Sequence, residues 1–393
     1  MIKINIKSFL EYLSVLLIIL TSGSICYYKT LSPNISIVFF ILFSIYFYCK
    51  HKIKRSNNFS FLYIIIFTLL ITISLLLNGN LADNQSFGHI LQAIGSYFII
   101  SNFNFYRFRQ ILLNITTLIC ILSIIVFTLS EFNLITPSIH PKGTFLTYAG
   151  ITLGWDTGLF HRLAGIFHEP GAFQILLNII LILFLKEISY WQLNKSEKLK
   201  LTVIIIALIL TKSTGGYLAS MTILTCALYR KMKSKWFIPI VGILILAVTF
   251  TLNTDVVQKK INPEEGKSIS LQDRIMDNIA MLQMTTERPI IGYGLGSQNY
   301  VKRSIQVGNI SSSNGILYIT SSIGILWLFL FLFFTYKAIK KLHVDAPIII
   351  LVAAYFMLQC NERFIEHPIS YILLLQYGSY QLPKVFEHHH KIQ

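Results

Sequence analysis

Polar side chains that could take part in a reaction gather in two stretches of an otherwise apolar chain, about residues 131–170 and 253–313. The first stretch ends in the sequence HEPGAF, in which His168 and Glu169 directly precede Pro170. Proline suits the first position of a helix, because its missing N–H is not needed there, and a glutamate beside the cap complements the helix dipole. Two interpretations stay open: a well-capped helix start, and a general base supplied by His168 or Glu169.

Basic side chains in both stretches could bind an anion. His161 and Arg162 lie shortly before HEPGAF, and Arg162 could either bind a phosphate through charge-assisted hydrogen bonds or pair with Asp156. A single surface charge is most often only solvated, but several cations on one face indicate an anion site. The further cations assigned to this face are Arg274, Arg288, Lys302, Arg303 and Arg363, with Glu362 and Glu366 as nearby acids.

The second stretch predicts an amphipathic helix followed by a glycine-rich turn. Residues 270–273 (SLQD) resemble a capping box, and apolar residues recur at helical spacing after them until Arg288-Pro289. A Gly-x-Gly-x-Gly run follows at 292–296. Such a run could let backbone N–H groups approach an anion. A tight turn is the favoured interpretation, because a phosphate-binding loop needs a strand and a helix around it.

The elements that hold these residues are predicted to be membrane-spanning helices. Of the 393 residues, 54% are hydrophobic and only 13% are charged, with a mean hydropathy of +0.63. A soluble domain carries about 25% charged residues and disordered chains are poor in apolar residues, so both classes are excluded. The chain predicts an all-α polytopic membrane protein, a single integral membrane domain over 1–393 whose two long outer loops, 131–170 and 253–313, carry short helices. About twelve spans are expected, at 9–28, 35–49, 59–77, 87–101, 111–130, 171–189, 199–211, 215–229, 236–252, 314–336, 346–360 and 367–381.

The distribution of charge predicts how these spans are oriented. Basic residues flank both ends of the pair 199–211 and 215–229, which places the turn at Gly215-Gly216 outside and the flanks in the cytoplasm. Cytoplasmic segments of membrane proteins carry an excess of Lys and Arg, and applying this rule along the whole chain puts both termini in the cytoplasm. The whole net charge of +16 then lies on the cytoplasmic side, and the outer side sums to zero. The net charge of +16 is therefore explained by the orientation of the chain in a bilayer, and no nucleic-acid partner is expected.

Metal and disulfide frameworks are not expected. The five cysteines all fall within predicted spans and are not clustered, which is typical of small buried hydrophobic side chains. The tract 388–390 (HHH) has no cysteine or carboxylate geometry beside it and is interpreted as a solvated tail. We therefore expect neither a metal site nor a cofactor.

Several motifs resemble those of the O-antigen ligase/polymerase superfamily. The stretch from Arg274 to Tyr300 combines an arginine, an amphipathic helix, a polar residue before Arg-Pro, and a glycine-rich turn followed by an aromatic residue. Residues 314–317 (NGIL) resemble the start of the span that follows in that family. The HEPGAF stretch is similar to that of many Wzy-type polymerases of surface polysaccharides.

The chain departs from the family pattern at two positions. Residues 210–216 (LTKSTGG) resemble the family's Ser-Arg-Gly turn, but Thr214 stands where arginine is usual, which leaves Lys212 as a candidate substitute. Ligases that transfer glycan to lipid A core carry a histidine just before the Asn-x-x-Leu stretch, and this chain has Ser313 there. The second departure favours a polymerase over a ligase.

The resemblance implies a polymerase that joins oligosaccharide repeat units carried on undecaprenyl pyrophosphate, at the outer face of the bacterial inner membrane. A sugar hydroxyl of one unit displaces the lipid pyrophosphate of another, which resembles an inverting transfer without a metal. The reaction needs a base for the hydroxyl and positive charge for the leaving pyrophosphate. The resemblance assigns the base to His168 or Glu169, pyrophosphate binding to Arg162, Arg274 and Arg288, and accessory roles to His161, Lys212, Arg303 and Arg363. The expected partners are the lipid-linked glycan and the bilayer, together with a chain-length regulator and a flippase.

Two other functions stay open. A ligase would transfer finished polymer to lipid A core. A flippase would carry the lipid-linked unit across the membrane, and such transporters line a central cavity with charged or polar groups inside their spans. The predicted spans carry no charge in their middle, and the second outer loop spans 253–313, so the flippase is the less favoured of the two.

Overall fold

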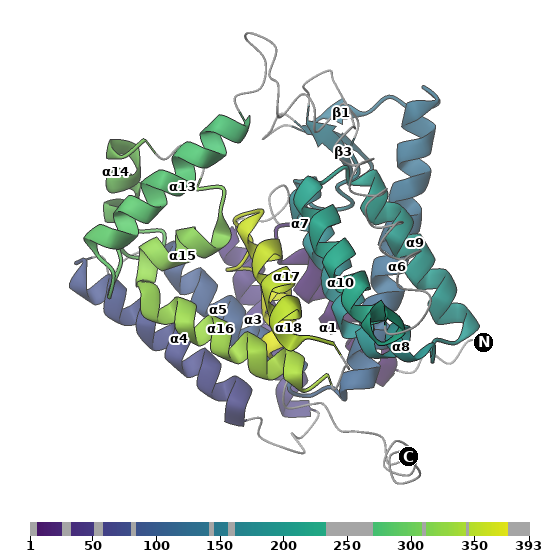
Figure 1. Ribbon diagram of the computed structural model, residues 1–393, viewed down its shortest axis with the longest axis horizontal. Coiled ribbons are helices and arrows are strands. Elements are labelled where there is room, and N and C mark those ends of the chain that lie inside the picture. The colour runs from purple at the N-terminus through teal and green to yellow at the C-terminus, as the bar shows by residue number, and fades with distance from the viewer. Residues whose placement is uncertain are drawn as a thin grey trace.

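The computed structural model describes residues 6–25, 33–50, 58–79, 84–140, 145–155, 162–232, 270–308, 312–342 and 346–375 (Figure 1). These residues form 15 helices and one small sheet. The helices are α1 (Ile6–Leu20), α3 (Pro33–Lys50), α4 (Asn58–Leu77), α5 (Asn84–Ile100), α6 (Phe105–Glu131), α7 (Pro170–Leu183), α8 (Leu185–Tyr190), α9 (Lys195–Leu210), α10 (Thr214–Met232), α13 (Ser270–Glu287), α14 (Gln298–Gln306), α15 (Gly315–Ile323), α16 (Ile325–Lys340), α17 (Ile348–Cys360) and α18 (Pro368–Leu375). The strands are β1 (Ser138–Ile139), β2 (Phe145–Tyr148) and β3 (Ile151–Trp155).

The described helices are consistent with a helical membrane protein. Within the described residues, two helical segments, Phe59–Leu77 and Phe105–Glu131, are long and apolar enough to cross a bilayer, and further apolar helices are shorter. Large apolar side chains also face outward, such as Leu42 on α3, Leu69 on α4 and Phe329 on α16. An extended exposed apolar surface of this kind suits contact with lipid. The count of twelve spans stays a prediction, and the span expected at 236–252 lies outside the described residues.

Two expected single spans are in fact broken, so that part of the prediction was wrong. The run 171–189 divides at Phe184 into α7 and α8, and the run 314–336 divides at Gly324 into α15 and α16. Gly324 has φ +95°, a backbone conformation that ends α15, and its neighbour Ile325 donates its N–H to the Pro289 carbonyl at 2.7 Å. Apolar composition did not reveal the break at Gly324, because α15 and α16 are similarly apolar. At Phe184 the change from the apolar α7 to α8, which carries Lys186 and Glu187, was interpreted as the end of one span.

The glycine-rich run at 292–296 forms a tight turn. Its three glycines all have positive φ. The N–H groups of Tyr293 and Gly294 donate to the carbonyls of Ser321 and Ser322 at the end of α15, at 3.0 and 2.8 Å. These amides are therefore engaged within the protein, which supports the turn and not the anion-binding alternative.

Replacing Gly324 with alanine is expected to destabilise the protein. The new Cβ would overlap the Ile290 carbonyl, and φ +95° is strained for any side chain. Strain of this kind costs about 1–3 kcal/mol, and forced backbone movement adds a comparable amount. Thermal unfolding of the purified protein in detergent measures the effect. Gly308→Ala is the matched control, because Gly308 also has positive φ (+76°) but its Cβ would meet open space; an equal loss in both variants would contradict the packing argument.

The first long loop forms strands where short helices were expected. Strands β1, β2 and β3 pair antiparallel in that order, and Ala149 and Gly150, both with positive φ, make the two-residue turn between β2 and β3. Such a turn matches the twist of the strands it joins. An isolated bridge between Thr152 and Gly165 then ties the sheet to the segment before α7. The alternation of buried and exposed residues over only four positions was too short to predict a strand.

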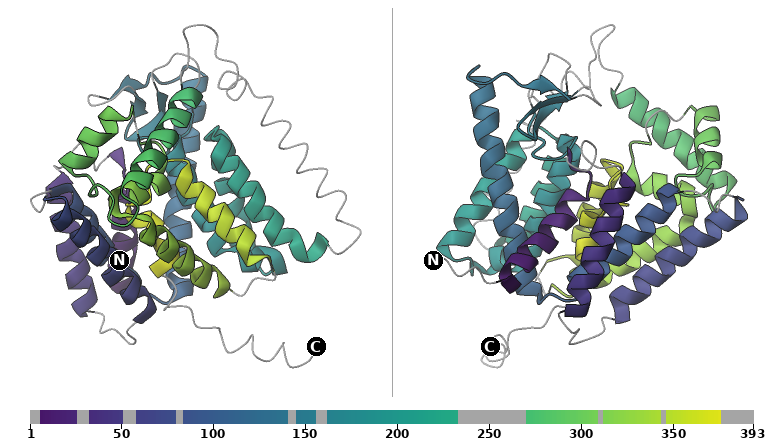
Figure 2. Two further views of the ribbon diagram at one scale, coloured as in Figure 1. Left: turned by 60° about the vertical axis from the view of Figure 1, so that its left-hand side comes forward. Right: turned by 180° about the vertical axis from the view of Figure 1, so that it is seen from behind.

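Helices α7 and α18 form the centre of the molecule. Every residue of both helices is buried. Helix α17 packs beside α10 (Figure 2), and α18 packs against α5 and α16. In Figure 1 the α17–α18 pair lies between two groups, α13 to α15 on one side and the sheet with α6 and α9 on the other. The connection between α17 and α18 therefore lies where both long loops can reach it.

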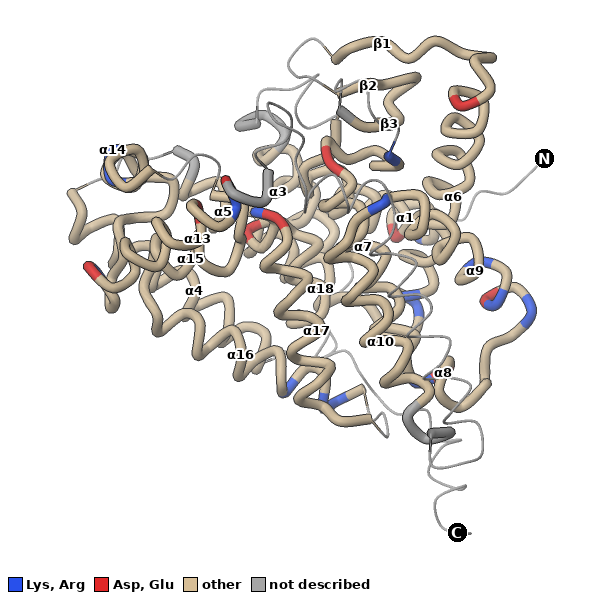
Figure 3. Tube along the Cα trace, turned by 45° about the horizontal axis from the view of Figure 1, so that its top comes forward, with Lys and Arg blue, Asp and Glu red and all other residues tan. Residues whose placement is uncertain are grey.

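Charged residues lie mainly at helix ends and in connections (Figure 3). Residues assigned to the cytoplasmic side contact one another: Arg107 pairs with Glu11 at 2.8 Å, and Arg109 pairs with Glu187 at 2.6 Å. Residues assigned outside do the same: Arg274 pairs with Glu362 at 3.1 Å. Each of these pairs joins residues that the charge pattern assigns to one side, and the orientation in the membrane stays a prediction.

Candidate active site

The connection between α17 and α18, residues 361–367, lies against the first turns of three helices. An added Cβ on Gly171 of α7 would overlap the Glu362 side chain, one on Gly215 of α10 would overlap the Asn361 side chain, and one on Gly315 of α15 would lie 2.6 Å from the Glu362 carbonyl. These close approaches require glycine. The starts of α7, α10 and α15 therefore converge on one short segment.

Helix α13 adds a cation to this segment. Arg274, in the second turn of α13, donates to the Asn361 carbonyl at 2.9 Å and to Glu362 Oε1 at 3.1 Å. The Arg274 side chain remains 46% exposed, so much of its guanidinium is open to a ligand. Because the starts of helices carry partial positive charge, Arg274 and the three helix starts together favour an anion here.

Two carboxyl groups meet at the start of α7. Glu169 is the N-cap residue of α7 but makes no capping hydrogen bond. Its carboxyl group instead lies close enough to that of Glu362 to affect the pKa of Glu362. Burial raises the pKa of Glu362 well above its usual range, and the charge of Glu169 raises it further, while Arg274 opposes the shift. A carboxyl group with a raised pKa is a suitable proton acceptor or donor near neutral pH.

His168 lies beside Glu169 and is held by the backbone of Gly23. Its Nδ1 lies 3.0 Å from the Gly23 carbonyl, so this nitrogen carries the proton and donates it. The Nε2 atom lies 3.8 Å from Glu169 Oε1. Burial lowers the pKa of His168, although the Gly23 carbonyl and Glu362 act in the opposite direction. The lowered pKa favours the neutral form of His168, and its Nε2 lies on the side of Glu169.

Arg162, in the first long loop, lies within electrostatic reach of Glu169 and Glu362. Its backbone N–H donates to the Leu153 carbonyl of β3 at 2.7 Å, and its Nε donates to the Thr211 carbonyl at 3.2 Å. Burial lowers the pKa of Arg162, and the negative charges of Glu362 and Glu169 raise it. The guanidinium stays charged at any working pH. We call Arg162, His168, Glu169, Arg274 and Glu362 the outer cluster.

The structure does not bring Arg288 or Arg303 to the outer cluster. Arg288 follows the far end of α13, fourteen residues after Arg274, which corresponds to about 21 Å along a helix. It donates to Asn78 and lies over the Tyr293 ring, 4.7 Å from the centroid. Arg303 forms an ion pair with Glu287 beside it and thereby lowers the pKa of Glu287 to about 2. Arg288 therefore does not lie with Arg162 and Arg274, which is evidence against a pyrophosphate site shared by all three.

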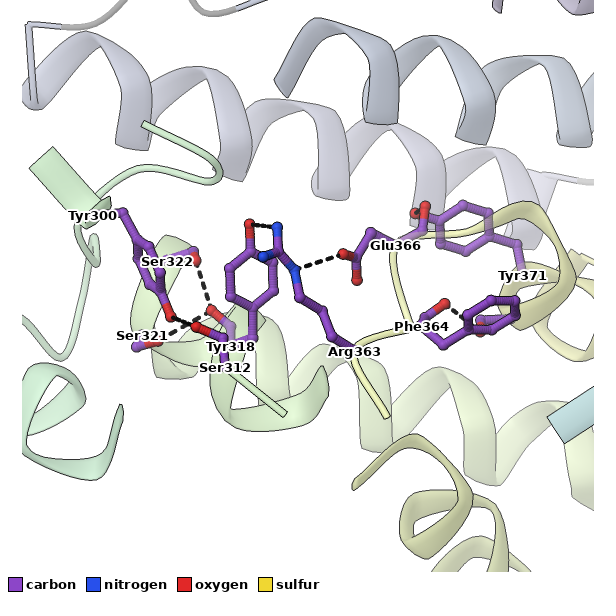
Figure 4. A network of polar contacts seen from close by, with 10 residues as sticks. Tyr300, Ser312, Tyr318, Ser321, Ser322, Arg363, Phe364, Glu366 and Tyr371 are labelled. Atoms are coloured by element: carbon purple, nitrogen blue, oxygen red, sulfur yellow. Dashed lines mark hydrogen bonds and ion pairs between the residues drawn. The ribbon is translucent and has the colours of Figure 1, made fainter. Parts of the chain in front are cut away.

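The remaining expected residues have other surroundings. Arg363 lies over the Tyr318 ring at 3.6 Å from the centroid and pairs with Glu366 at 3.1 Å, within the polar network that Figure 4 shows. Lys212 has φ +48° in the turn before α10, and its Nζ lies 5.9 Å from the Phe127 ring centroid. His161 and Asp156 lie outside the described residues.

Glu362 is the main residue that sequence reasoning missed as a site residue. It was counted only as an outer acid, because the connection at 361–366 is short and the two long loops held most of the polar residues. A signal was present: a membrane protein with few charges places two acids and an arginine within five residues there. In the part of the chain that the structure describes, groups of three or more His, Cys, Asp or Glu residues that could hold a metal ion are not found.

The arrangement can hold an anion and move a proton. Arg162 and Arg274 supply two guanidinium groups, and Glu362, Glu169 and neutral His168 supply proton acceptors beside them. A reaction that expels an anionic leaving group and takes a proton from a nucleophile needs these two functions together.

Comparison with known proteins points to one family. Residues 201–332 match the O-antigen ligase family. The matched region runs from α9 to α16 and includes Arg274, whereas the other four residues of the outer cluster lie beyond it. The comparison with curated proteins finds no match. The family match supports a relation to the O-antigen ligase/polymerase superfamily, whose members are glycosyltransferase-like enzymes of polysaccharide assembly in membranes.

Proposed function

We propose that this protein is a polymerase that joins lipid-diphosphate-linked oligosaccharide repeat units at the outer face of the bacterial inner membrane. The observation that carries the proposal is the outer cluster, in which Arg274 contacts Glu362 and His168 lies near Glu169. Arg162 is within electrostatic reach of both carboxyl groups. The family match at residues 201–332 supports a glycosyl transfer on such substrates. Undecaprenyl pyrophosphate is the expected carrier.

In the proposed reaction the oxygen of a sugar hydroxyl attacks the anomeric carbon of a second unit. The new C–O bond forms as the bond from that carbon to the diphosphate oxygen breaks, so the lipid diphosphate leaves with the electron pair. Arg162 and Arg274 stabilise this leaving group, and a base of the outer cluster takes the hydroxyl proton. Removing one such charged donor typically costs 10²–10³-fold in rate, and a base contributes typically 10²–10⁴-fold. Attack from the side opposite the diphosphate makes the transfer inverting.

A ligase that transfers finished polymer to lipid A core is the second candidate. The description of the matched family favours it, and the chemistry at the anomeric carbon is the same. Ser313, where such ligases carry a histidine, favours the polymerase. In the structure the N–H of Ser313 faces Asp277 Oδ2 at 3.4 Å. Ser313 directly precedes the N-cap of α15, and a serine there cannot offer a substrate the ring nitrogen of a histidine.

Deletion of the gene in its own bacterium separates these functions. We expect a deletion strain to display single repeat units on its surface in place of the long glycan ladder, and the intact gene to restore the ladder. Gel analysis of surface glycan and of extracted lipid-linked glycan measures the outcome. Long polymer retained on the lipid carrier would identify a ligase instead, and a surface without any repeat unit would identify a flippase.

A further inference from the structure

The pairing of the two carboxyl groups identifies the base more closely, and this inference rests on the proposed glycosyl transfer. We propose that Glu362 is the catalytic residue that takes the proton of the attacking sugar hydroxyl, and that Glu169 is a positioning residue acting through Glu362. The sequence favoured His168 or Glu169 for this role, because both belong to HEPGAF. The geometry of the α17–α18 connection points to Glu362.

The backbone and side chain of Glu362 are held from several directions. Gly315 of α15 packs against its carbonyl, Gly171 of α7 lies directly under its side chain, and Gly215 of α10 packs against the neighbouring Asn361. A group held on rigid helices keeps its geometry better than one on a free loop, and a catalytic base must be held within a fraction of an ångström. Glu362 meets this requirement although it lies in a connection.

Glu362 also lies beside the cation that would bind the diphosphate. Its Oε1 is 3.1 Å from Arg274, and its side chain remains 18% exposed, so the carboxyl group is mostly enclosed but can be reached. Arg274 uses two N–H groups on Asn361 and Glu362, and a guanidinium has five. The exposed edge of Arg274 can thus contact a diphosphate while Glu362 keeps its place.

Glu169 has a different environment. Its side chain is 27% exposed, makes no cap bond to α7, lies 3.8 Å from His168 and acts on the pKa of Glu362. The charged and titratable groups that face Glu362 are Glu169, His168, Arg162 and Arg274. The negative charge of Glu169 raises the pKa of Glu362 and so makes it a stronger base, whereas the cations act against this. Removing the charge of Glu169 should weaken the base without removing it.

The proton balance of the step is simple. The hydroxyl proton passes to the Glu362 carboxylate as the hydroxyl oxygen bonds to the anomeric carbon, and the electron pair of the broken bond leaves with the diphosphate. Glu362 must therefore be ionised before the step. Because its pKa is raised, activity should fall as the pH drops through that raised value and should be full above it.

Purified protein in proteoliposomes tests the proposal, with single lipid-linked repeat units extracted from the deletion strain as substrate. We expect Glu362→Gln to lower the initial rate of polymer formation by about 10²-fold or more at every pH. We expect Glu169→Gln to keep most of the activity and to shift the acid side of the pH profile to lower pH, because Glu362 loses a negative neighbour. Added formate should restore part of the rate to Glu362→Ala, since it can replace the missing carboxylate.

Glu287→Gln is the matched control, because Glu287 also pairs with an arginine but at the far end of α13, and its rate should equal that of the wild type. Activity of Glu362→Gln near the wild-type rate would overturn the proposal, as would formate rescue of Glu169→Ala in place of Glu362→Ala. Loss in both glutamine variants without any formate rescue would overturn it too, because a structural role explains that pattern. If wild-type protein makes no polymer from these units, the proposed function itself fails.

Discussion

Gly171→Ala is expected to lower the rate of polymer formation about 100-fold while the protein stays folded. The methyl group would occupy the space of the Glu362 carboxyl group and the carbons next to it. The side chain of Glu362 would have to rotate away by more than an ångström, and a displacement of about 1 Å can cost 10²-fold in rate. The helix itself gains, because alanine is a better helix former than glycine by about 1 kcal/mol. Initial rates in proteoliposomes and thermal unfolding in detergent measure the two effects separately.

Gly88→Ala in α5 provides the control for Gly171→Ala. Gly88 also lies within a helix, but its added Cβ would meet only the flexible end of the Ile37 side chain. We expect wild-type activity from this variant. Full activity of Gly171→Ala would contradict the placement of Glu362 at the reacting centre, and an unfolded Gly171→Ala protein would contradict the view that only one side chain has to move.

The second large effect concerns the three arginines that the sequence treated as equivalent. Arg162→Ala and Arg274→Ala are each expected to lower the rate by about 10²–10³-fold, because each removes positive charge from the leaving diphosphate. Arg288→Ala should leave the rate nearly unchanged, since Arg288 lies at the other end of α13 against Asn78 and Tyr293. The expected rank order is thus two nearly inactive variants and one active variant.

The length of the surface glycan ladder in the complemented deletion strain measures this prediction, with protein level followed on a blot. Arg303→Ala serves as a further control, because Arg303 pairs with Glu287 away from the outer cluster. A complete ladder from Arg162→Ala at normal protein level would rule out its role in binding the diphosphate. Single repeat units from Arg288→Ala at normal level would place a second anion site at the far end of α13.

Local patterns predicted most of the helices. Runs of apolar residues located α3, α4, α5 and α10 to within a few residues, because a span needs a continuous apolar surface whatever its neighbours are. The same signal missed the breaks at Phe184 and Gly324, since an apolar run does not show where a helix inside it ends. It also missed the three-stranded sheet, whose strands are only two to five residues long.

The sequence also brought out part of the outer cluster. His168, Glu169, Arg162 and Arg274 were named from their types and from their place near helix starts, and the structure brings all four together. Arg288 is also an arginine in the second long loop, yet the rise of helix α13 separates it from Arg274 by about 21 Å. The type of a residue and the loop it belongs to do not show which end of α13 packs against the distant segment 361–367.

The amino-acid sequence by itself predicted a helical membrane protein, with which the structure is consistent, and identified which residue types could act on an anionic lipid-linked substrate. These properties depend on composition and on periodicity along the chain, which each segment carries independently of the rest. Only the tertiary structure decided that Glu362 joins Glu169, and that Gly171, Gly215 and Gly315 make room for the segment that carries it. Contacts between residues up to two hundred positions apart depend on how the helices pack, and packing is a property of the whole bundle.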